Sequence, residues 1–194
     1  MKVAIIRYNA GNVQSVSFAL ARLGVDFVDT DNIDEIKRAD KVIFPGVGEA
    51  STTMKYLRDK NLDRLIPALK QPVLGICLGM QLLCSRSEEN DTNCLGVFEE
   101  CVMKFRPQDN TKVPHVGWNN IQVTSDWLDP QLQNQHVYFV HSYYVPIGTS
   151  TSATTEYITP FSAAIRKQNF FGVQFHPEKS ANAGELVLKS FLGQ

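Results

Sequence analysis

The sequence has no excess of charge of either sign and no long apolar run. Lysine and arginine together number 19, against 20 aspartates and glutamates, so the formal net charge is -1. This balance provides no basic field to hold nucleic acid or an anionic membrane, and we expect small molecules or proteins as partners. Near the N-terminus only residues 3–6 are uniformly apolar before Arg7, too few for a signal peptide or a membrane span. We therefore expect a cytoplasmic protein.

Cysteine is scarce and irregularly spaced. The four cysteines have neither CxxC spacing nor paired histidines near them, so we expect no metal site and no bound cofactor. A cytosolic location also argues against disulfide bonds. We interpret Cys84, Cys94 and Cys101 as small core residues. Cys77 needs separate treatment because of its neighbours.

Apolar runs alternate with helical patterns along the first half of the chain. With 194 residues, 43% of them hydrophobic, we predict one domain over residues 1–194. Strands separated by helices favour a parallel sheet covered by helices, whereas the second half is richer in strands. We predict an α/β fold, flavodoxin-like, with three α/β/α layers. Its central sheet is expected to be mixed and mainly parallel, with an antiparallel annex in the second half.

The expected elements follow from these patterns and from glycine, proline and asparagine between them. In the first half we expect strands over 2–8, 25–30, 41–46 and 71–77, and helices over 13–24, 49–69 and 78–87. In the second half we expect strands over 95–105, 119–124, 136–145, 161–168 and 170–176, then a helix over 184–192.

Residues 75–79, GICLG, have the G-x-nucleophile-x-G form. Small flanking residues tolerate a sharp strand-to-helix turn, which would thrust the Cys77 side chain into solvent at the carboxyl edge of the sheet. Backbone N–H groups and the positive end of the helix dipole favour thiolate over thiol there. The amide of Leu78 is a natural donor to an oxyanion. Taken alone, the pentapeptide also suits a buried cysteine in a glycine-rich turn.

The segment FFGVQFHPE, residues 170–178, offers a base for this thiolate. Strand alternation puts Gln174 and His176 on one side, and Glu178 falls on the same side. Its carboxylate could hold the imidazole tautomer and stabilise the protonated ring. The alternative is a strand-end histidine beside a solvated glutamate. His141 is a rival base without a carboxylate near it in sequence, and we rank it lower. We interpret the remaining two histidines as surface residues: His115 and His136.

A second glycine-rich turn, PGVG at residues 45–48, follows the third expected strand. Its glycines let the backbone approach a ligand or adopt unusual dihedral angles, so the turn could supply a second oxyanion amide. It lacks the GxGxxG pattern of a dinucleotide site. By itself PGVG is typical of a tight turn between a strand and a helix.

Together, GICLGMQ, the distant HPE and the PG-rich turn resemble class I (triad) glutamine amidotransferases over nearly the whole chain. More narrowly, YNAGNVQSV, PGVG, PHVGWNN, YFVHSYY and QFHPEKS resemble the glutaminase subunits of imidazole glycerol phosphate synthases, enzymes of histidine biosynthesis. The resemblance implies that Cys77 attacks the side-chain amide of glutamine, His176 shuttles protons and Glu178 orients His176. A thioester would form, and glutamate and ammonia would be the products.

The resemblance also implies roles around these three residues. The oxyanion hole would combine the amides of Val47 and Leu78, with a resting form in which the Val47 amide is turned away and Leu78 is the only donor. Substrate glutamine would be held by Gly46, Gly48, Gln81, Ser142 and Tyr143. The partner would be a (β/α)8-barrel cyclase subunit in a heterodimer, contacted by Asn12, Trp118, Tyr138 and Lys179.

Three alternatives remain open at this stage. A free-standing cysteine hydrolase could use the same residues on another acyl substrate, and ester or peptide turnover would reveal it. A non-catalytic binding or chaperone-like protein could use Cys77 to sense oxidation, and would turn over nothing. Within the amidotransferases, the chain could serve another two-chain synthase, such as that for pyridoxal phosphate or anthranilate.

Overall fold

A mixed sheet forms the centre of the structure, a computed structural model that describes residues 1–8, 13–108 and 111–194. Within these residues the sheet has eight strands, in the order β2-β1-β3-β4-β14-β13-β12-β9. The pairs from β2 to β14 are parallel and those from β14 to β9 are antiparallel. The strands are β1 (Lys2–Ile6), β2 (Asp26–Thr30), β3 (Lys41–Phe44), β4 (Val73–Ile76), β9 (Gln122–Val123), β12 (Thr151–Glu156), β13 (Pro160–Lys167) and β14 (Phe170–Val173).

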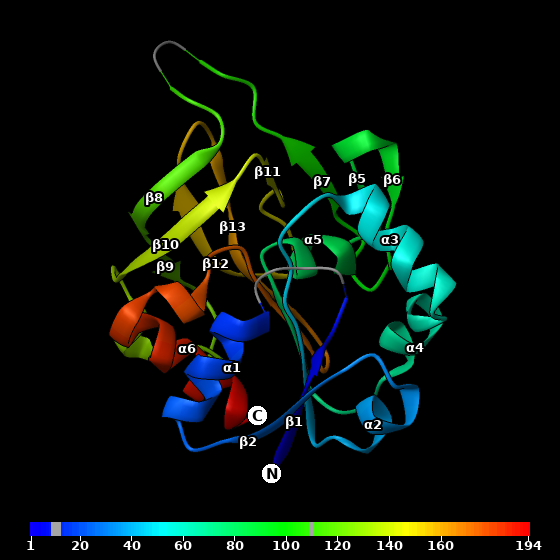
Figure 1. Cartoon of the computed structure of the whole chain (residues 1–194). Coiled ribbons are helices and arrows are strands. Elements are labelled where there is room, and N and C mark those ends of the chain that lie inside the picture. Colours follow the sequence, from blue (N-terminus) through cyan, green and yellow to red (C-terminus); the bar gives the residue numbers. More distant parts are fainter. Residues whose placement is uncertain (9–12, 109–110) are drawn as a thin grey trace.

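Helices cover both faces of this sheet (Figure 1). In β1, Val3 and Ile5 enter the core on one face, while Ala4 and Ile6 enter the core on the other, because neighbouring side chains of a strand point in opposite directions. All four are fully buried. The first core is covered by α1 (Val13–Arg22) and α6 (Ala181–Leu192), and the second by α2 (Ile33–Arg38), α3 (Ala50–Asp59), α4 (Leu62–Ala68) and α5 (Leu78–Leu83). The predicted α/β class with a mainly parallel sheet is confirmed.

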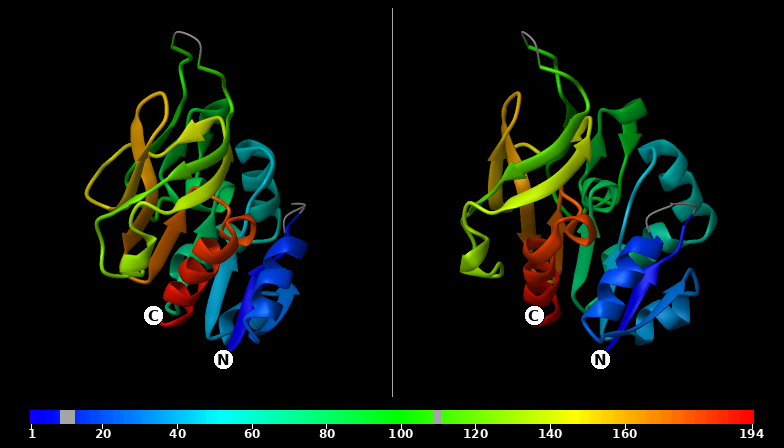
Figure 2. Two further views of the ribbon diagram at one scale, coloured as in Figure 1. Left: turned by 90° about the vertical axis from the view of Figure 1, so that its left-hand side faces the viewer. Right: turned by 60° about the vertical axis from the view of Figure 1, so that its left-hand side comes forward.

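A largely antiparallel annex, drawn mostly from the second half of the chain, lies above the carboxyl ends of the parallel strands (Figure 2). One part is the pair β8 (His115–Asn120) and β10 (His136–His141). The other is a small sheet of β5 (Arg86–Ser87), β6 (Thr92–Asn93), β7 (Cys101–Lys104) and β11 (Tyr143–Tyr144). Short 3-10 helices are η1 (Glu89–Asp91), η2 (Pro130–Leu132) and η3 (Pro177–Lys179). Both termini lie at the opposite end of the molecule.

Three helix predictions need correction. The helix expected over 49–69 is two helices, because Asn61 adopts the left-handed conformation, with φ 58°, between α3 and α4. The helix α2 was not expected, although Asn32 caps it by accepting the N–H groups of Asp34 and Glu35. The helix expected over 78–87 ends at Leu83, because the next residue turns to an extended conformation.

Two strands were missed in the second half. The strand β12 is rich in threonine, whose branched side chain suits a strand, but it has no hydrophobic alternation to reveal it. The strand β8 contains a glycine and two asparagines, residues that are typical of turns. The strand β8 pairs with β10 across a long connection, whereas β12 pairs with β13 across a short turn and with the distant β9 on its other edge. Within the described residues, no helix has the length and apolar character that crossing a bilayer requires.

Candidate active site

Cys77 stands on a strained corner between β4 and α5. Its φ is 52° and its ψ is -109°, a conformation that costs a non-glycine residue about 1–3 kcal/mol. The flanking glycines are needed by packing. A Cβ at Gly79 would lie 1.9 Å from the carbonyl oxygen of Phe44, and one at Gly75 would lie 2.7 Å from the amide of Met80. The predicted sharp turn is therefore present, held in place by close contacts on both sides.

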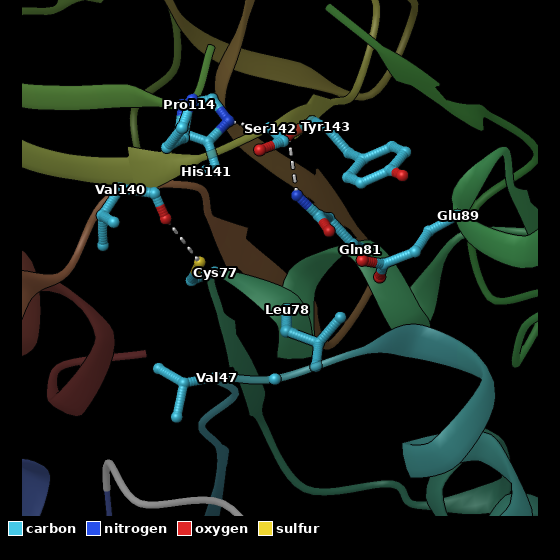
Figure 3. Close-up of a pocket in the computed structure, with 11 residues that line it drawn as sticks. Val47, Cys77, Leu78, Gln81, Glu89, Pro114, Val140, His141, Ser142 and Tyr143 are labelled. Atoms are coloured by element: carbon cyan, nitrogen blue, oxygen red, sulfur yellow. Dashed lines mark hydrogen bonds between the residues drawn. The ribbon is translucent and has the colours of Figure 1, made fainter.

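The Cys77 side chain opens into a cavity of about 330 Å³ (Figure 3). Only 6% of the residue is exposed. The side chain therefore lies in a pocket, and the expectation that it would project into solvent was wrong. The cavity brings together residues from the β3–α3 turn, from α5, from η1 and from the end of β10. Its lining is Val47, Gly48, Cys77, Leu78, Gln81, Glu89, Pro114, Val140, His141, Ser142 and Tyr143.

His176 and Glu178 form a buried pair beside this sulfur. The Nδ1 atom of His176 lies 2.7 Å from Oε1 of Glu178, and both side chains are inaccessible to solvent. Burial lowers the pKa of His176, but hydrogen bonds and charges of Cys77 and Glu178 outweigh it and raise that pKa to about 10. Because Glu178 engages Nδ1, Nε2 is the ring nitrogen that can exchange a proton with the sulfur. The arrangement supports a thiolate–imidazolium pair.

The backbone around His176 is fixed by the following helix and by β10. Its N–H donates to the carbonyl of Tyr138 at 2.9 Å, and its own carbonyl accepts the Ser180 hydroxyl at 2.6 Å. The same hydroxyl accepts the Tyr138 N–H at 2.9 Å. A Cβ at Gly184 would lie 1.8 Å from the carbonyl oxygen of Pro177, so only glycine allows α6 to pack this closely against η3. The base is therefore held on a rigid support.

His141 reaches the same cavity but stays neutral. Its Nδ1 donates to the carbonyl of Tyr143 at 2.7 Å, and its Nε2 lies 3.1 Å from Nδ1 of His115. Burial lowers the pKa of His141 to about 3, and burial alone lowers that of His115 to about 4. His115 is only 4% exposed, so the prediction of a surface residue was wrong for it, whereas His136 is exposed as expected.

The expected oxyanion hole is closed in this structure. The N–H of Leu78 donates to the carbonyl of Gly46 at 3.3 Å, so it is not the open donor that the sequence analysis expected. The Gly46 carbonyl and the Val47 N–H belong to the same trans peptide group, so they point in opposite directions. Because the carbonyl faces the Leu78 N–H, the Val47 N–H faces away from it. A Cβ at Gly46 would lie 2.6 Å from the Tyr8 hydroxyl, which itself donates to the carbonyl of Pro45 at 2.6 Å. The turn is thus tightly held on one side.

The residues expected to hold glutamine are brought together only in part. Four line the cavity, namely Gly48, Gln81, Ser142 and Tyr143, whereas Gly46 is buried and does not line it. Glu89 also lines the cavity, although no sequence pattern indicated it. It begins the short helix η1, in an acidic stretch whose sequence is typical of solvated surface, and only the fold turns it inward. Its Oε2 accepts the N–H of Ala50 at 2.8 Å, and burial raises its pKa.

Three of the four residues expected at a partner interface form one cluster at the surface, in which Tyr138 is half-buried. Tyr138 and Trp118 pair across β10 and β8, with ring centroids 6.0 Å apart. The Lys179 ammonium lies 5.9 Å from the centre of the Tyr138 ring, and 54% of Trp118 is exposed. Asn12 lies outside the residues that the structure describes.

The remaining cysteines are not equally buried. Cys84 is completely buried, as expected of a core residue, and burial raises its pKa. Cys94 and Cys101 are only half-buried, so their assignment to the core was too strong. Burial also raises the pKa of Cys94, to about 12. None of the three lines the cavity that Cys77 enters.

Comparisons with known proteins show what the chain is similar to. Residues 5–193 match the family described as "Glutamine amidotransferase class-I". The chain is 57% identical to imidazole glycerol phosphate synthase subunit HisH of Bacteroides fragilis (strain YCH46), over 99% of both chains. It is 44% identical to the subunit of that name from Idiomarina loihiensis, over 99% of this chain and 97% of the relative. A crystal structure of a glutamine amidotransferase, 18% identical, shares the fold with a TM-score of 0.77, over 98% of this chain and 97% of that one.

Proposed function

This chain belongs to the class-I glutamine amidotransferase family, and we propose that it is the glutaminase subunit of an imidazole glycerol phosphate synthase in histidine biosynthesis. One observation carries the proposal: Cys77 stands on a strained corner beside the buried His176–Glu178 pair, inside a cavity large enough for an amino acid. The relatives named above, matched over almost their full length, support the assignment to this synthase. The four free thiols suit a reducing, cytoplasmic location.

In the first half-reaction, the Cys77 thiolate attacks the side-chain carboxamide carbon of glutamine. The carbonyl π electrons move to oxygen, which gives a tetrahedral oxyanion. His176, protonated on Nε2, transfers that proton to the amide nitrogen as the carbon–nitrogen bond breaks. The products of this step are ammonia and a γ-glutamyl thioester, and Glu178 stabilises the imidazolium while it carries the charge.

In the second half-reaction, water attacks the thioester carbon. His176 is now neutral, and it accepts a proton from this water as general base. Collapse of the second tetrahedral intermediate breaks the carbon–sulfur bond, so glutamate leaves and the thiolate–imidazolium pair is restored. One proton shuttle therefore serves both steps, and this explains why the geometry around a single imidazole is so tightly fixed.

The amino-acid end of glutamine would bind at the far side of the cavity from the sulfur. Glu89 offers a carboxylate there, oriented by the Ala50 N–H that it accepts. Gln81 donates both of its side-chain N–H groups to protein acceptors, the Tyr143 carbonyl at 2.8 Å and Gln174 Oε1 at 2.9 Å. Its remaining carbonyl oxygen can only accept. Both groups therefore suit an ammonium group of the substrate.

We assign the closed oxyanion hole to a resting state. Rotation of the Gly46–Val47 peptide would withdraw the Gly46 carbonyl from Leu78 and turn the Val47 N–H toward the oxyanion, so one movement would supply two donors. Loss of a single such donor costs about 10²–10³ in rate. The isolated chain should therefore hydrolyse glutamine poorly. Gating of this kind would restrict ammonia release to moments when an acceptor is bound nearby.

The acceptor would lie on a separate (β/α)8-barrel cyclase subunit, and the two chains would form a heterodimer. The surface cluster of Trp118, Tyr138 and Lys179 supports a docking surface, because tryptophan and tyrosine are enriched at the centres of interfaces. This cluster adjoins the base, since Lys179 immediately follows Glu178. Docking could therefore be sensed directly at the active site.

Reconstitution with the candidate cyclase subunit tests the proposal. Glutamate release is measured for this chain alone, with the cyclase, and with the cyclase plus its nucleotide ligand, and we expect rates to rise by at least about 10²–10³ across the series, the effect of one donor. The Val47→Pro variant lacks the amide, so it should assemble but show no such rise. Equal rates under all three conditions would refute gating. Absence of glutamine turnover, or turnover of esters or peptides in its place, would refute the function.

A further inference from the structure

A buried glutamine next to the nucleophile has no part in the chemistry described so far. Gln174 directly follows β14 and is completely buried. Its Nε2 atom lies 3.6 Å from the sulfur of Cys77, within hydrogen-bonding reach of so large an acceptor. Its Oε1 atom lies 2.9 Å from Nε2 of Gln81. One side chain thus touches both the nucleophile and a residue that faces the substrate cavity.

The direction of these hydrogen bonds is fixed by a backbone carbonyl. The oxygen of Tyr143 can only accept, so the group of Gln81 that faces it at 2.8 Å must be its amide nitrogen. The second N–H of Gln81 then meets Gln174, which must present its oxygen. The amide nitrogen of Gln174 is left facing the sulfur. A chain of two amides therefore ensures that Cys77 meets a donor.

We propose that Gln174 is a positioning residue for the glutaminase reaction, which directs one N–H at the Cys77 thiolate and with its oxygen fixes the orientation of Gln81. This inference rests on the proposed function. The short helix α5, only six residues long, strengthens the need for such a donor because a short helix has a small dipole. A donor favours the thiolate, as the His176 imidazolium does, whereas the contact of the sulfur with the carbonyl of Val140 at 3.9 Å suits only the neutral thiol.

Titratable groups around the sulfur must be taken into account in any pH experiment. His176 and Tyr8 both interact with Cys77 electrostatically. His141 and Glu89 share the cavity with it. Among the described residues, no hydrogen bond joins Gln174 to Tyr8, His141 or Glu89. A change at Gln174 should therefore shift the behaviour of the sulfur without replacing any of them.

Two substitutions separate the two contacts of Gln174. The change Gln174→Glu is nearly isosteric and keeps an oxygen acceptor for Gln81, but it places a carboxylate where the sulfur now meets an N–H. The change Gln174→Leu removes both contacts. The matched control is Gln71→Leu: the Gln71 side chain donates to the Ile36 carbonyl at 2.9 Å, far from the cavity, so its loss reports general loosening.

The readout is the rate of Cys77 alkylation by iodoacetamide against pH, followed by mass spectrometry on the full chain without glutamine. For both Gln174 variants we expect alkylation at pH 7 to slow about ten-fold and the midpoint of the pH profile to rise by about one unit, the scale of one hydrogen bond to a charged group. With the cyclase present, KM for glutamine should rise several-fold in Gln174→Leu and change little in Gln174→Glu.

Several results would overturn the proposal. A pH profile for Gln174→Glu that superimposes on that of the wild type would show that Gln174 does not act as a donor to the sulfur. An unchanged KM in Gln174→Leu would show that Gln174 does not orient Gln81. An equal slowing in Gln71→Leu would attribute the effect to loosening. Because alkylation needs no glutamine turnover, shifted profiles in a protein without glutaminase activity would refute the proposed function while leaving the role of Gln174 intact.

Discussion

Two buried histidines lie beside the same cavity and differ in charge. His176 and His141 are both almost inaccessible, at 0% and 6% exposure. The pKa of His176 rises to about 10, because Cys77 and Glu178 outweigh the cost of burial. That of His141 falls to about 3, because burial dominates and its nearest side-chain partner is another histidine. Burial alone therefore does not decide whether an imidazole is charged. The groups that its ring nitrogens contact decide it.

The two environments suit opposite tasks. A carboxylate on Nδ1 keeps a proton available on Nε2 of His176, which is what a shuttle between sulfur and leaving group needs. The neutral pair of His141 and His115 instead forms a fixed chain of hydrogen bonds that ends on the Tyr143 carbonyl. That carbonyl also accepts from Gln81. We therefore regard the neutral pair as a structural support for the substrate side of the cavity.

The largest effect should come from removing the Cys77 sulfur, with which the charged His176 exchanges a proton. Cys77→Ala should reduce glutamine hydrolysis by about 10⁴-fold or more, because no thioester can form. Cys84→Ala, the control, removes a buried thiol outside the cavity and should keep most of the activity. Glutamate release by the reconstituted complex measures both. Added ammonium salt should restore product formation in Cys77→Ala, and glutaminase activity surviving in this variant would contradict the assignment.

The comparison itself is tested by removing each histidine in turn. His176→Ala should lower kcat by about 10³-fold, because both half-reactions lose their proton shuttle. His141→Ala should cost roughly ten-fold or less, the scale of lost hydrogen bonds around the cavity. Steady-state kinetics with the cyclase and its ligand provide the measurement, with thermal unfolding as a check on folding. Equal losses in the two variants would show that the proton shuttle is misassigned.

A smaller loss is expected when the orienting carboxylate becomes an amide. Glu178→Gln should fall between the two histidine variants, near 10²-fold in kcat, because the imidazole remains but its charge partner is gone. The same change should move His176 toward the behaviour of His141, with protonation lost at lower pH. An NMR titration of the labelled ring would follow this. A ring that still titrates as in the wild type would argue against Glu178 as the source of the charge.

The smallest effects concern stability. Its dependence on pH has opposite signs for His176 and for the pair of His141 and His115. A raised folded-state pKa, as for His176, gives stability that is complete below about pH 6.5 and is lost as the pH rises toward 10. Lowered values of about 3 and 4, as for His141 and His115, give stability that is present above pH 6.5 and is lost as the pH falls. Each proton contributes a slope of roughly 1.4 kcal/mol per pH unit.

The substitution His115→Phe tests the loss of stability at low pH. Phenylalanine can keep the stacking of this ring on Tyr157, whose centroid lies 4.1 Å away, but it cannot be protonated. It also leaves His141 Nε2 without its donor, so we expect a loss of about 1–3 kcal/mol at pH 7. Urea unfolding between pH 7 and pH 5 measures how steeply the free energy of unfolding falls as the pH is lowered. In His115→Phe this slope should be shallower by the contribution of about one proton. The exposed His136, changed to Phe, is the control, and an unchanged slope in His115→Phe would contradict the burial effect.

Much of the site could be predicted because its signals are local in sequence. The glycines around Cys77 and the two-residue step from His176 to Glu178 are short-range patterns, and each places its side chains through the geometry of one turn or one strand. Glu89 could not be found in this way. Its inward position depends on the contact with Ala50, 39 residues earlier in the chain. The burial of His115 likewise follows from strand pairing and not from its neighbours in sequence.

The sequence by itself determined the elements that carry chemistry: a cysteine on a glycine-flanked corner, a histidine with a carboxylate two residues away, and a turn whose peptide can rotate. These depend on dihedral preferences and strand periodicity, which act over a few residues. Tertiary structure alone decided which histidine is charged, which donor meets the sulfur and whether the oxyanion hole is open. Those properties depend on burial and on partners such as Gln174, 97 residues from Cys77, because electrostatic effects follow distance in space and not along the chain.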